Sequence, residues 1–402
     1  MKPLEFDLLI VGGHGHVGLP MGIALADAGL QVALYDLNRA SGEVIARGEM
    51  PFLEYDAEPI LKRVIGRTLH LVDRLEAVQH SRTVVVTIGT PVDEYLNPEL
   101  LPMFRLADDL QPLLRAGHHV ILRSTVFPGT TERLADYMQV RERGIHLSFC
   151  PERIAQGYAI RELRKLPQII SGVDERSLQL SRELFSALDL KIVELSVREA
   201  ELAKLFSNAW RYIQFATSNQ FFMIATENGA DFNRIRYAMT DGYRRAADFP
   251  GAGFAAGPCL LKDTMQLSAF YHNNFLLGHA AMLVNEGLPS FLVRQIAARR
   301  SLQGRKVGIL GMAFKRDVDD TRDSLSYKLA KLLRFHGADV LCSDEFADRP
   351  EFVSKEQLVQ ESEIIIVGAP HSAYSHLTIP SHIEVVDIWN CLTTATAARA
   401  AA

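Results

Sequence analysis

Cys259 is the side chain best suited to covalent chemistry in this chain of 402 residues. It lies in the small-residue run GAGFAAGPCLLKD, which covers residues 251–263 and ends in Lys262 and Asp263. A thiolate can attack a carbonyl carbon, and a nearby ammonium group stabilises the thiolate. Free cysteine is also often a small buried hydrophobic residue, but the charged neighbours here favour a nucleophile.

Lys204 and Asn208 form a second candidate group. They are four residues apart in an expected helix and therefore share one face. A cation beside an amide can stabilise an alkoxide or another oxyanion. The pair also fits an ordinary polar helix face, so its interpretation as a catalytic pair depends on the other motifs.

A glycine-rich loop near the N-terminus is typical of dinucleotide binding. The sequence GHGHVG at 13–18 follows an expected strand over 7–12 and precedes an expected helix over 19–29. Glycine permits the tight turn and lets backbone N–H groups approach a pyrophosphate, although a strand-to-helix turn without a ligand can also require it. The expected cofactor contacts in this loop are Gly13, Gly15, His16, Val17 and Gly18. The imidazoles of His14 and His16 fit solvated or packing positions.

Asp36 indicates which dinucleotide the loop binds. It ends the next expected strand, over 31–35, and lies 18 residues after Gly18. A carboxylate at this place accepts hydrogen bonds from the adenosine ribose and repels a 2′-phosphate. The sequence therefore favours NAD over NADP.

Three further loops follow expected strands of the same sheet and contain Thr90, Thr125 and Glu152. Loops at the carboxyl ends of parallel strands line the ligand crevice. We expect Thr90 and Thr125 to contact the cofactor, and Thr125 and Glu152 to hold a water near the reacting carbon. The alternatives are a capped turn for Thr90 and a structural ion pair for Glu152.

Composition excludes several classes of function. The net charge of −5 and the pI near 6.2 give no electrostatic reason to expect nucleic acid or an anionic membrane as partner. The four cysteines are far apart and show no metal-ligand spacing, so we expect reduced thiols and no metal. The N-terminal apolar run lacks a signal-peptide cleavage region and is too short for a membrane span. These features indicate a cytoplasmic enzyme.

The order of elements predicts an α/β fold with two Rossmann-like, doubly wound domains joined by a central helical domain that contains a long helix. The expected divisions are 1–195, 196–300 and 301–402. Further expected strands cover 83–88, 119–123, 146–149, 339–343, 363–367 and 383–388, and helical patterns cover 198–240 and 264–300, the latter with a kink or break at Pro289. Residues 393–402 are expected to fray.

These motifs, in this order, resemble the nucleotide-sugar 6-dehydrogenases, the family that contains UDP-glucose and UDP-N-acetylmannosamine dehydrogenases. The resemblance spans nearly the whole chain and is carried by GHGHVGLP (13–20), STVFPGTT (124–131), PERIAQGYAI (151–160), ELAKLFSNAW (201–210), GFAAGPCLLKD (253–263) and GMAFKRDVDDTRDS (311–324). It implies an N-terminal NAD domain, a central helical domain that forms a homodimer, and a C-terminal domain that holds the nucleotide of a UDP-linked sugar.

The resemblance also implies a reaction, the oxidation of the sugar C6 alcohol to a carboxylate with two NAD molecules reduced in turn. Lys204 and Asn208 would stabilise charge on the reacting oxygen, and Cys259 would carry a thiohemiacetal and then a thioester. Water would hydrolyse the thioester, positioned or activated by Glu152, Thr125 or Asp263.

Ligand contacts are carried over from the family onto matching positions. Arg322 is assigned to the cofactor, and the substrate contacts are Glu152, Arg153, Lys204, Asn208, Arg244, Gly257 and Lys315. Arg245 competes with Arg244 for a place in the site of the partner subunit. Pro258, directly before the nucleophile, departs from the family pattern and bears on the geometry of the cysteine loop. The form PER at 151–153 resembles the N-acetylhexosamine branch and bears on the choice of sugar.

Three alternatives remain open. The substrate could be UDP-glucose or another nucleotide hexose. A single-hydride dehydrogenase of the β-hydroxyacid type would share the NAD domain and a helical second domain, but it needs neither the cysteine nor a third domain. A nucleotide-sugar binder without catalysis is disfavoured because Lys204, Asn208, Cys259 and Asp263 are all retained.

Overall fold

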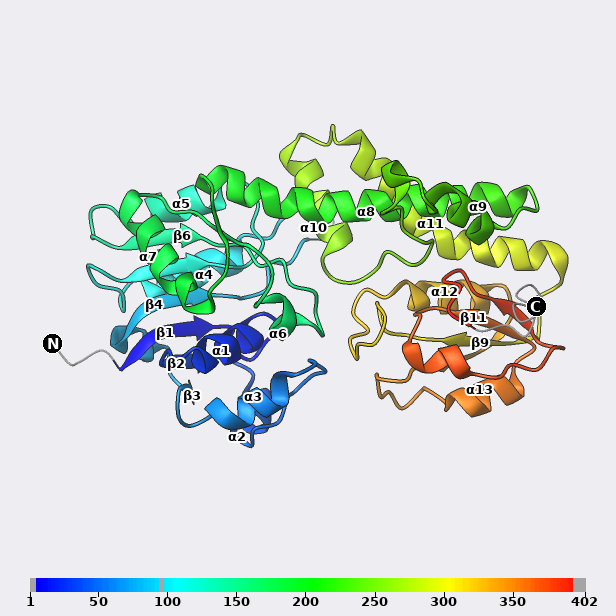
Figure 1. Cartoon of the computed structure of the whole chain (residues 1–402), viewed down its shortest axis with the longest axis horizontal. Helices are drawn as coiled ribbons and strands as arrows, with labels where there is room; N and C mark the ends of the chain where they lie inside the picture. The colour runs from blue at the N-terminus through cyan, green and yellow to red at the C-terminus, as the bar shows by residue number, and fades with distance from the viewer. Residues whose placement is uncertain (1–4, 94–96, 393–402) are drawn as a thin grey trace. The chain divides into compact units, whose positions relative to one another are not determined.

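The computed structural model describes residues 5–93 and 97–392, and the chain divides into two compact units, Met1–Ser207 and Asn208–Ala402 (Figure 1). Each unit contains a parallel sheet covered by helices. The predicted α/β fold class with two Rossmann-like sheets is therefore confirmed. The segment expected to fray, 393–402, lies outside the described residues.

The first unit is built on a six-stranded sheet in the order β3-β2-β1-β4-β5-β6, with every neighbouring pair parallel. The order reverses between β1 and β4, which is the topological switch point where such sheets bind ligands. The strands are β1 (Phe6–Val11), β2 (Val32–Tyr35), β3 (Leu69–Leu71), β4 (Ser81–Val86), β5 (His119–Leu122) and β6 (His146–Phe149).

Strand β1 shows why these strands are largely apolar. Leu8 and Ile10 pack into one hydrophobic core, and Leu9 and Val11 pack into another on the opposite face. Since side chains alternate along a strand, burial of both faces requires an unbroken apolar run.

Helices and short elements complete the first unit. α1 lies against β1 and β2 (Figure 1). The helices are α1 (Gly18–Asp27), α2 (Arg39–Ala46), α3 (Ala57–Val64), α4 (Leu101–Leu110), α5 (Thr130–Tyr137), α6 (Ala159–Glu162) and α7 (Glu175–Phe185), with 3-10 turns η1 (Leu75–His80) and η2 (Ser186–Leu188). Strands β7 (Gln168–Ile170) and β8 (Ile192–Glu194) form a separate parallel pair.

The long helical pattern over 198–240 is two helices rather than one. Helix α8 (Val197–Glu227) ends where Gly229 adopts a φ of +66°, a left-handed conformation that glycine accepts readily. Asp231 then accepts hydrogen bonds from the backbone of residues 233 and 234 and begins α9 (Phe232–Thr240).

The second predicted helical region also divides, but not at Pro289. Helix α10 (Leu260–Phe270) is separated from α11 (Leu276–Arg299) by a turn in which His272 and Asn273 have φ values of +54° and +58°. Pro289 lies inside α11. By length and composition α11 could cross a membrane, but its residues Leu288, Phe291 and Ile296 pack in the core of the second unit.

The second unit contains a four-stranded parallel sheet in the order β10-β9-β11-β12. Its strands are β9 (Lys306–Leu310), β10 (Asp339–Ser343), β11 (Ile364–Val367) and β12 (Glu384–Val386). Helices α12 (Leu325–Phe335) and α13 (Lys355–Glu361) follow β9 and β10, and two 3-10 turns are η3 (Arg244–Ala246) and η4 (Ser372–His376).

Candidate active site

The glycine-rich loop after β1 is tightly packed at its base and open at its tip. A Cβ at Gly18 would lie 2.4 Å from the carbonyl oxygen of Gly12, and one at Gly13 would lie 2.8 Å from Leu34 Cβ. A Cβ at Gly15 would meet, among the described residues, only the Gly12 oxygen at 3.5 Å. A side chain at Gly15 would thus fill the space before the N-terminus of α1, where a pyrophosphate binds in such folds.

Asp36 lies beside this loop, as the sequence predicts. Its Oδ2 accepts a hydrogen bond from the backbone of His14 at 3.0 Å, and its Oδ1 accepts one from Asn38 at 2.9 Å. The carboxylate stays partly exposed, with lone pairs left for ribose hydroxyls. His14 and His16 pack locally: His14 Nδ1 lies 3.0 Å from the Asn38 carbonyl oxygen, and the His16 ring centroid lies 4.0 Å from that of Phe52.

The loops at the switch point are tied together by hydroxyl groups. Thr87 Oγ1 donates to the carbonyls of Val11 and Gly12 at 2.9 and 3.0 Å, and Ser124 Oγ donates to Ile88 at 2.6 Å. Thr90 and Thr125 are half-buried in the loops after β4 and β5. The residues fit NAD: a glycine loop, a strand-end carboxylate and two hydroxyl-bearing loops belong to one edge of the sheet.

Glu152 is held in a buried ion pair with Arg123, a residue that is only 1% exposed. The other carboxylate oxygen, Oε1, accepts hydrogen bonds from the backbone of Arg153 and Ile154 at 2.7 and 3.0 Å. Arg123 also donates to the Cys150 carbonyl and Gln168 Oε1 at 3.1 and 3.2 Å. This arrangement favours the ion-pair interpretation of Glu152, while its role in handling water stays a prediction.

A small cavity adjoins Glu152. Its volume is about 10 Å³, and its lining includes Glu152, Arg153 and Gln168. That is about the smallest cavity that can hold one water molecule. The guanidinium of Arg153 donates to the carbonyl oxygen of Pro167, and its predicted contact with the substrate stays a prediction.

Glu201, on α8, fastens the loop that carries Thr125. Its two carboxylate oxygens accept hydrogen bonds from Gly129 N at 2.6 Å and Thr131 N at 3.0 Å, at the start of α5. Burial raises the pKa of Glu201 above its ordinary value, and these hydrogen bonds offset part of the rise. The buried carboxylate thus serves as a cap supplied from another helix.

Cys259 lies exposed at the N-cap position of α10 in the second unit. Gly257, two residues earlier, has a φ of +95°, and a Cβ there would lie 2.4 Å from the Phe314 ring. Its N–H donates to the Asp323 carbonyl at 3.2 Å. Pro258 therefore follows a left-handed glycine, and together they direct the chain into α10, whose N-terminal N–H groups favour an anion such as a thiolate.

Asp263 is the buried carboxylate next to this cysteine, one turn along α10 and 1% exposed. Asn208 Nδ2 donates to its Oδ2 at 2.5 Å, and Lys262 Nζ lies 2.9 Å from its Oδ1. An amide and an ammonium therefore compensate the buried charge. Lys204 is half-buried on the same helix as Asn208 but belongs to the first unit.

Arg322 is paired with Asp320. A bidentate hydrogen bond to the Asp320 carboxylate is the main cause that raises the pKa of Arg322, and the Cys259 thiol adds a smaller electrostatic contribution. Its predicted contact with the cofactor stays a prediction. Lys315 is half-buried in the loop after β9, and Arg244 and Arg245 are exposed on η3.

The predicted site residues thus form two groups. The first unit contains the glycine loop, Asp36, Thr90, Thr125 and Glu152. The second unit contains Asn208, Gly257, Cys259, Asp263 and Arg322. The sequence interpretation missed Arg123, Glu201 and Asp320. A charged residue at the end of an apolar strand was the signal for Arg123, and the shared helix face with Lys204 and Asn208 was the signal for Glu201.

A glycine loop at the switch point of a Rossmann sheet, a strand-end aspartate and a cysteine at a helix N-terminus define an NAD-dependent oxidoreductase. Comparison with known proteins extends this. The UDP-glucose/GDP-mannose dehydrogenase family matches the chain with its NAD binding domain over residues 8–189, its central domain over 198–286 and its UDP binding domain over 308–394. The chain belongs to this family and is an NAD-dependent nucleotide-sugar dehydrogenase.

Individual relatives agree with this assignment. The chain is 28% identical over 379 residues to the UDP-N-acetyl-D-mannosamine dehydrogenase of Pyrococcus horikoshii, with 91% of this chain and 90% of the relative covered. A UDP-glucose dehydrogenase from Pyrobaculum islandicum superposes with a TM-score of 0.87 at 28% identity, over 96% of this chain and 94% of that one. The structure of the P. horikoshii UDP-D-ManNAc dehydrogenase gives a TM-score of 0.87 at 26% identity, with 96% of each chain covered.

Proposed function

We propose that this enzyme oxidises the C6 hydroxyl of a UDP-N-acetylhexosamine, of the ManNAc or GlcNAc type, to the uronic acid through a thioester on Cys259. The overall reaction consumes the alcohol, two NAD⁺ and one water, and it yields the carboxylate, two NADH and three protons. The observation that carries this proposal is an exposed cysteine at the N-terminus of α10, one turn from the buried carboxylate of Asp263.

The first unit is proposed to hold the cofactor through Gly13, Gly15, His16, Val17 and Gly18, with Asp36 on the adenosine ribose and Thr90 and Thr125 from neighbouring loops. When bound, NAD would accept a hydride from C6. Arg322 of the second unit is proposed as a further cofactor contact, and its electrostatic interaction with Cys259 also suits it to stabilise the thiolate.

The covalent step is proposed for Cys259 in the second unit. Removal of the first hydride and of the hydroxyl proton leaves an aldehyde, while Lys204 and Asn208 stabilise charge on its oxygen. The Cys259 sulfur then forms a bond to C6, the oxygen takes a proton, and a thiohemiacetal results. Loss of a second hydride, together with the hydroxyl proton, gives the thioester. Water attacks its carbonyl carbon and releases two protons, so the carboxylate forms and the thiolate is expelled.

Asp263 is our preferred group for positioning the hydrolytic water. It lies on the same helix as Cys259, and Asn208 holds its carboxylate. Glu152 and Thr125 are assigned the same task by resemblance. The preference for Asp263 rests on its place one turn from Cys259 on α10, because the carboxylate oxygens of both Glu152 and Asp263 have partners within the protein.

The sugar and the nucleotide are proposed from relatives and from sequence. Curated relatives at 28% identity are named UDP-N-acetyl-D-mannosamine dehydrogenase, and the PER form of the loop at 151–153 agrees with that branch. Proposed substrate contacts are Glu152, Arg153, Lys204, Asn208, Arg244, Gly257 and Lys315. UDP-glucose is the second candidate, because a UDP-glucose dehydrogenase superposes on the chain with a TM-score of 0.87.

We also propose a homodimer through the central helices. Phe206, Trp210, Phe221 and Ile224 are more than 40% exposed, and their spacing places all four on one face of α8. Exposed apolar side chains that share one helix face are typical of protein interfaces. Light scattering should therefore give twice the chain mass.

The cytoplasm is the compartment that we propose for this enzyme, because none of its four cysteines, all of which the structure describes, forms a disulfide.

The test is a count of NADH per sugar. Purified enzyme given a limiting amount of UDP-N-acetylmannosamine should form two NADH for each sugar consumed, and Cys259→Ala and Cys259→Ser should abolish the four-electron reaction. A panel of UDP-, GDP- and dTDP-sugars, UDP-glucose included, identifies the substrate. A wild-type yield of one NADH with a stable aldehyde product would refute the thioester mechanism.

A further inference from the structure

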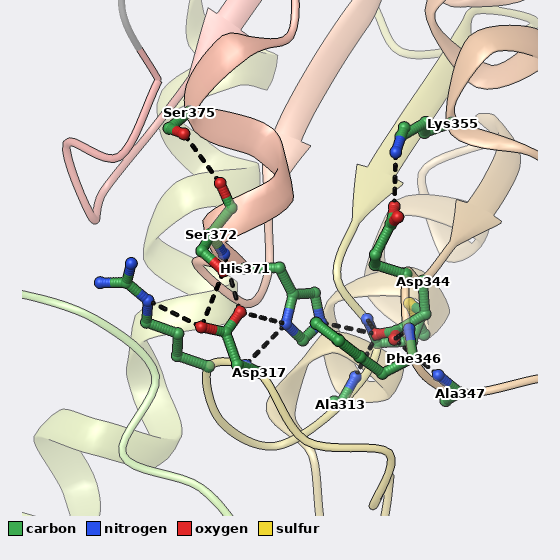
Figure 2. Close-up of polar contacts among 12 residues, drawn as sticks. Ala313, Asp317, Asp344, Phe346, Ala347, Lys355, His371, Ser372 and Ser375 are labelled. Atoms are coloured by element: carbon green, nitrogen blue, oxygen red, sulfur yellow. Dashed lines mark hydrogen bonds and ion pairs between the residues drawn. The ribbon is translucent and has the colours of Figure 1, made fainter. Parts of the chain in front are cut away.

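His371 lies at the centre of a buried polar network in the second unit (Figure 2). The residue is 1% exposed and lies just before η4. Its Nδ1 accepts a hydrogen bond from Asp317 N at 2.9 Å, and its Nε2 lies 3.1 Å from Asp344 Oδ2. Because an ionised carboxylate can only accept, Nε2 donates to Asp344, while Nδ1 accepts from the backbone of Asp317. One ring thus connects the loop after β9 to the end of β10.

Both carboxylate oxygens of Asp344 accept hydrogen bonds in this network. Its side chain is 0% exposed. Besides His371, Oδ2 accepts hydrogen bonds from Met312 N and Ala313 N at 2.6 and 2.8 Å, and Oδ1 accepts from residues 346 and 347 at 2.9 Å each (Figure 2). Burial alone would raise the pKa of Asp344, but these hydrogen bonds outweigh it and lower the pKa.

Asp344 occupies the same place in its sheet as Asp36 does in the first unit. Each follows the strand that pairs with the first strand of its Rossmann sheet, and each bonds the backbone of the loop after that first strand. Asp36 is partly exposed and has lone pairs left for a ribose. Five donors occupy Asp344, so it serves only to hold its loop.

The loop after β9 needs such support. Asp317 has a φ of +54°, a conformation that residues other than glycine adopt rarely. Its N–H is taken by His371, and its carboxylate accepts from Ser372 N at 2.7 Å and Ser372 Oγ at 2.9 Å. The segment 312–317 is therefore held at both ends, by Asp344 at residues 312 and 313 and by His371 and Ser372 at residue 317.

We propose that His371, supported by Asp344, is a positioning residue for nucleotide-sugar binding. It holds segment 312–317, which carries Lys315, in its binding conformation. The inference rests on the proposed function, because Lys315 is a proposed substrate contact. In this proposal His371 acts through the loop, by its contact with Asp317 N.

Two substitutions separate the two contacts of the ring. In His371→Asn the amide oxygen takes the place of Nδ1 and can still accept from Asp317 N. In His371→Gln the amide nitrogen takes the place of Nε2 and keeps only the Asp344 contact. We expect His371→Gln to raise the KM for the nucleotide sugar about tenfold, the usual effect of one lost buried hydrogen bond, and His371→Asn to raise it less. The KM for NAD should change less than about twofold.

The matched control is His376→Gln, because His376 is an exposed histidine of the same short helix. Ser372→Ala is the mild variant: Ser372 is exposed, so the protein should fold, and loss of one hydroxyl bond to Asp317 should raise the sugar KM by about two- to fivefold. Hydrogen exchange of the amides of Met312, Ala313 and Asp317 reports the state of the loop directly. We expect faster exchange at Asp317 in His371→Gln than in His371→Asn.

Unchanged sugar KM values in His371→Gln and Ser372→Ala would overturn the inference, whether or not exchange at Asp317 becomes faster. An equal rise in the KM for NAD would overturn it too, because general loosening would then explain the effect. A wild-type enzyme that turns over no nucleotide sugar would refute the proposed function and this inference together. Normal wild-type turnover with unaffected variants would refute the inference alone.

Discussion

Asn208 and Asp263, which are 55 residues apart in the sequence, are joined by a hydrogen bond of 2.5 Å from the Asn208 amide to Asp263 Oδ2. The bond connects α8 to α10 and fixes the buried carboxylate one turn from Cys259. Lys262 Nζ lies 2.9 Å from the other oxygen. The orientation of this carboxylate therefore depends on a side chain from a different helix.

Asn208→Ala should lower kcat strongly. The change removes the donor to Asp263 and leaves part of a buried charge uncompensated, which costs catalysis that relies on a fixed carboxylate. We expect a loss of about 10- to 100-fold in kcat, measured as NADH formation at saturating sugar and NAD. Ser207→Ala, which loses only a bond to the Ala203 carbonyl of its own helix, is the control. A kcat within twofold of wild type would argue against a catalytic role for the Asn208–Asp263 pair.

Gly257→Ala should distort the cysteine loop. The residue has a φ of +95°, and the new Cβ would lie 2.4 Å from the ring of Phe314. We expect a loss of about 1–3 kcal/mol in the free energy of unfolding, measured with urea, together with altered alkylation of Cys259 by iodoacetamide. In Gly287→Ala the new methyl lies in helix α11 and meets nothing within 4 Å, so stability should stay the same or rise. Equal stability of the two variants would contradict the proposed constraint.

Glu201→Gln should destabilise the first unit even though it removes a buried charge. The carboxylate accepts from Gly129 N and Thr131 N with separate oxygens, whereas an amide has one oxygen and must turn its NH₂ group toward the other N–H. We expect a loss of about 1–3 kcal/mol in the free energy of unfolding. Glu227→Gln, at the exposed end of the same helix, should have little effect. A stabilised Glu201→Gln protein would show that the cost of burial dominates.

His119 should make the protein less stable in mild acid. It is 0% exposed, and burial is the main cause that lowers its pKa from 6.5 to about 3. Above pH 6.5 the imidazole is neutral in both the folded and the unfolded protein. Between pH 6.5 and about pH 3 the unfolded chain binds a proton at this imidazole and the folded protein does not. The free energy of unfolding therefore falls as the pH falls.

The size of this effect can be measured with His119→Gln. Between pH 7.5 and pH 5 the wild type should lose about 2 kcal/mol more of its free energy of unfolding than His119→Gln does. His336→Gln, which removes an exposed histidine, should show the pH dependence of the wild type. If wild type and His119→Gln lose stability in parallel, His119 is not the group responsible.

Much of this protein could be inferred from local patterns. The unbroken apolar strands predicted buried parallel sheets, GHGHVG with Asp36 predicted the NAD loop, and the order of the motifs predicted the family. These features succeed because strand burial, glycine turns and helix faces depend on residues close in sequence. Local patterns predicted the ends of helices less well. The break at Gly229 and the turn at 271–275 interrupt regions whose sequence looks continuously helical. Pro289, by contrast, lies inside a helix and does not interrupt it.

Pairings between distant residues needed the tertiary structure. Cys259 with Lys262 and Asp263 could be read from adjacent positions, but the Asn208 bond to Asp263, the Arg123 pair with Glu152 and the His371 bridge from Asp317 to Asp344 could not. Each joins separate strands, loops or helices, and its partner is chosen by how those elements pack. The cost of burying a charge then requires a partner within reach, and only the packed fold determines which one that is.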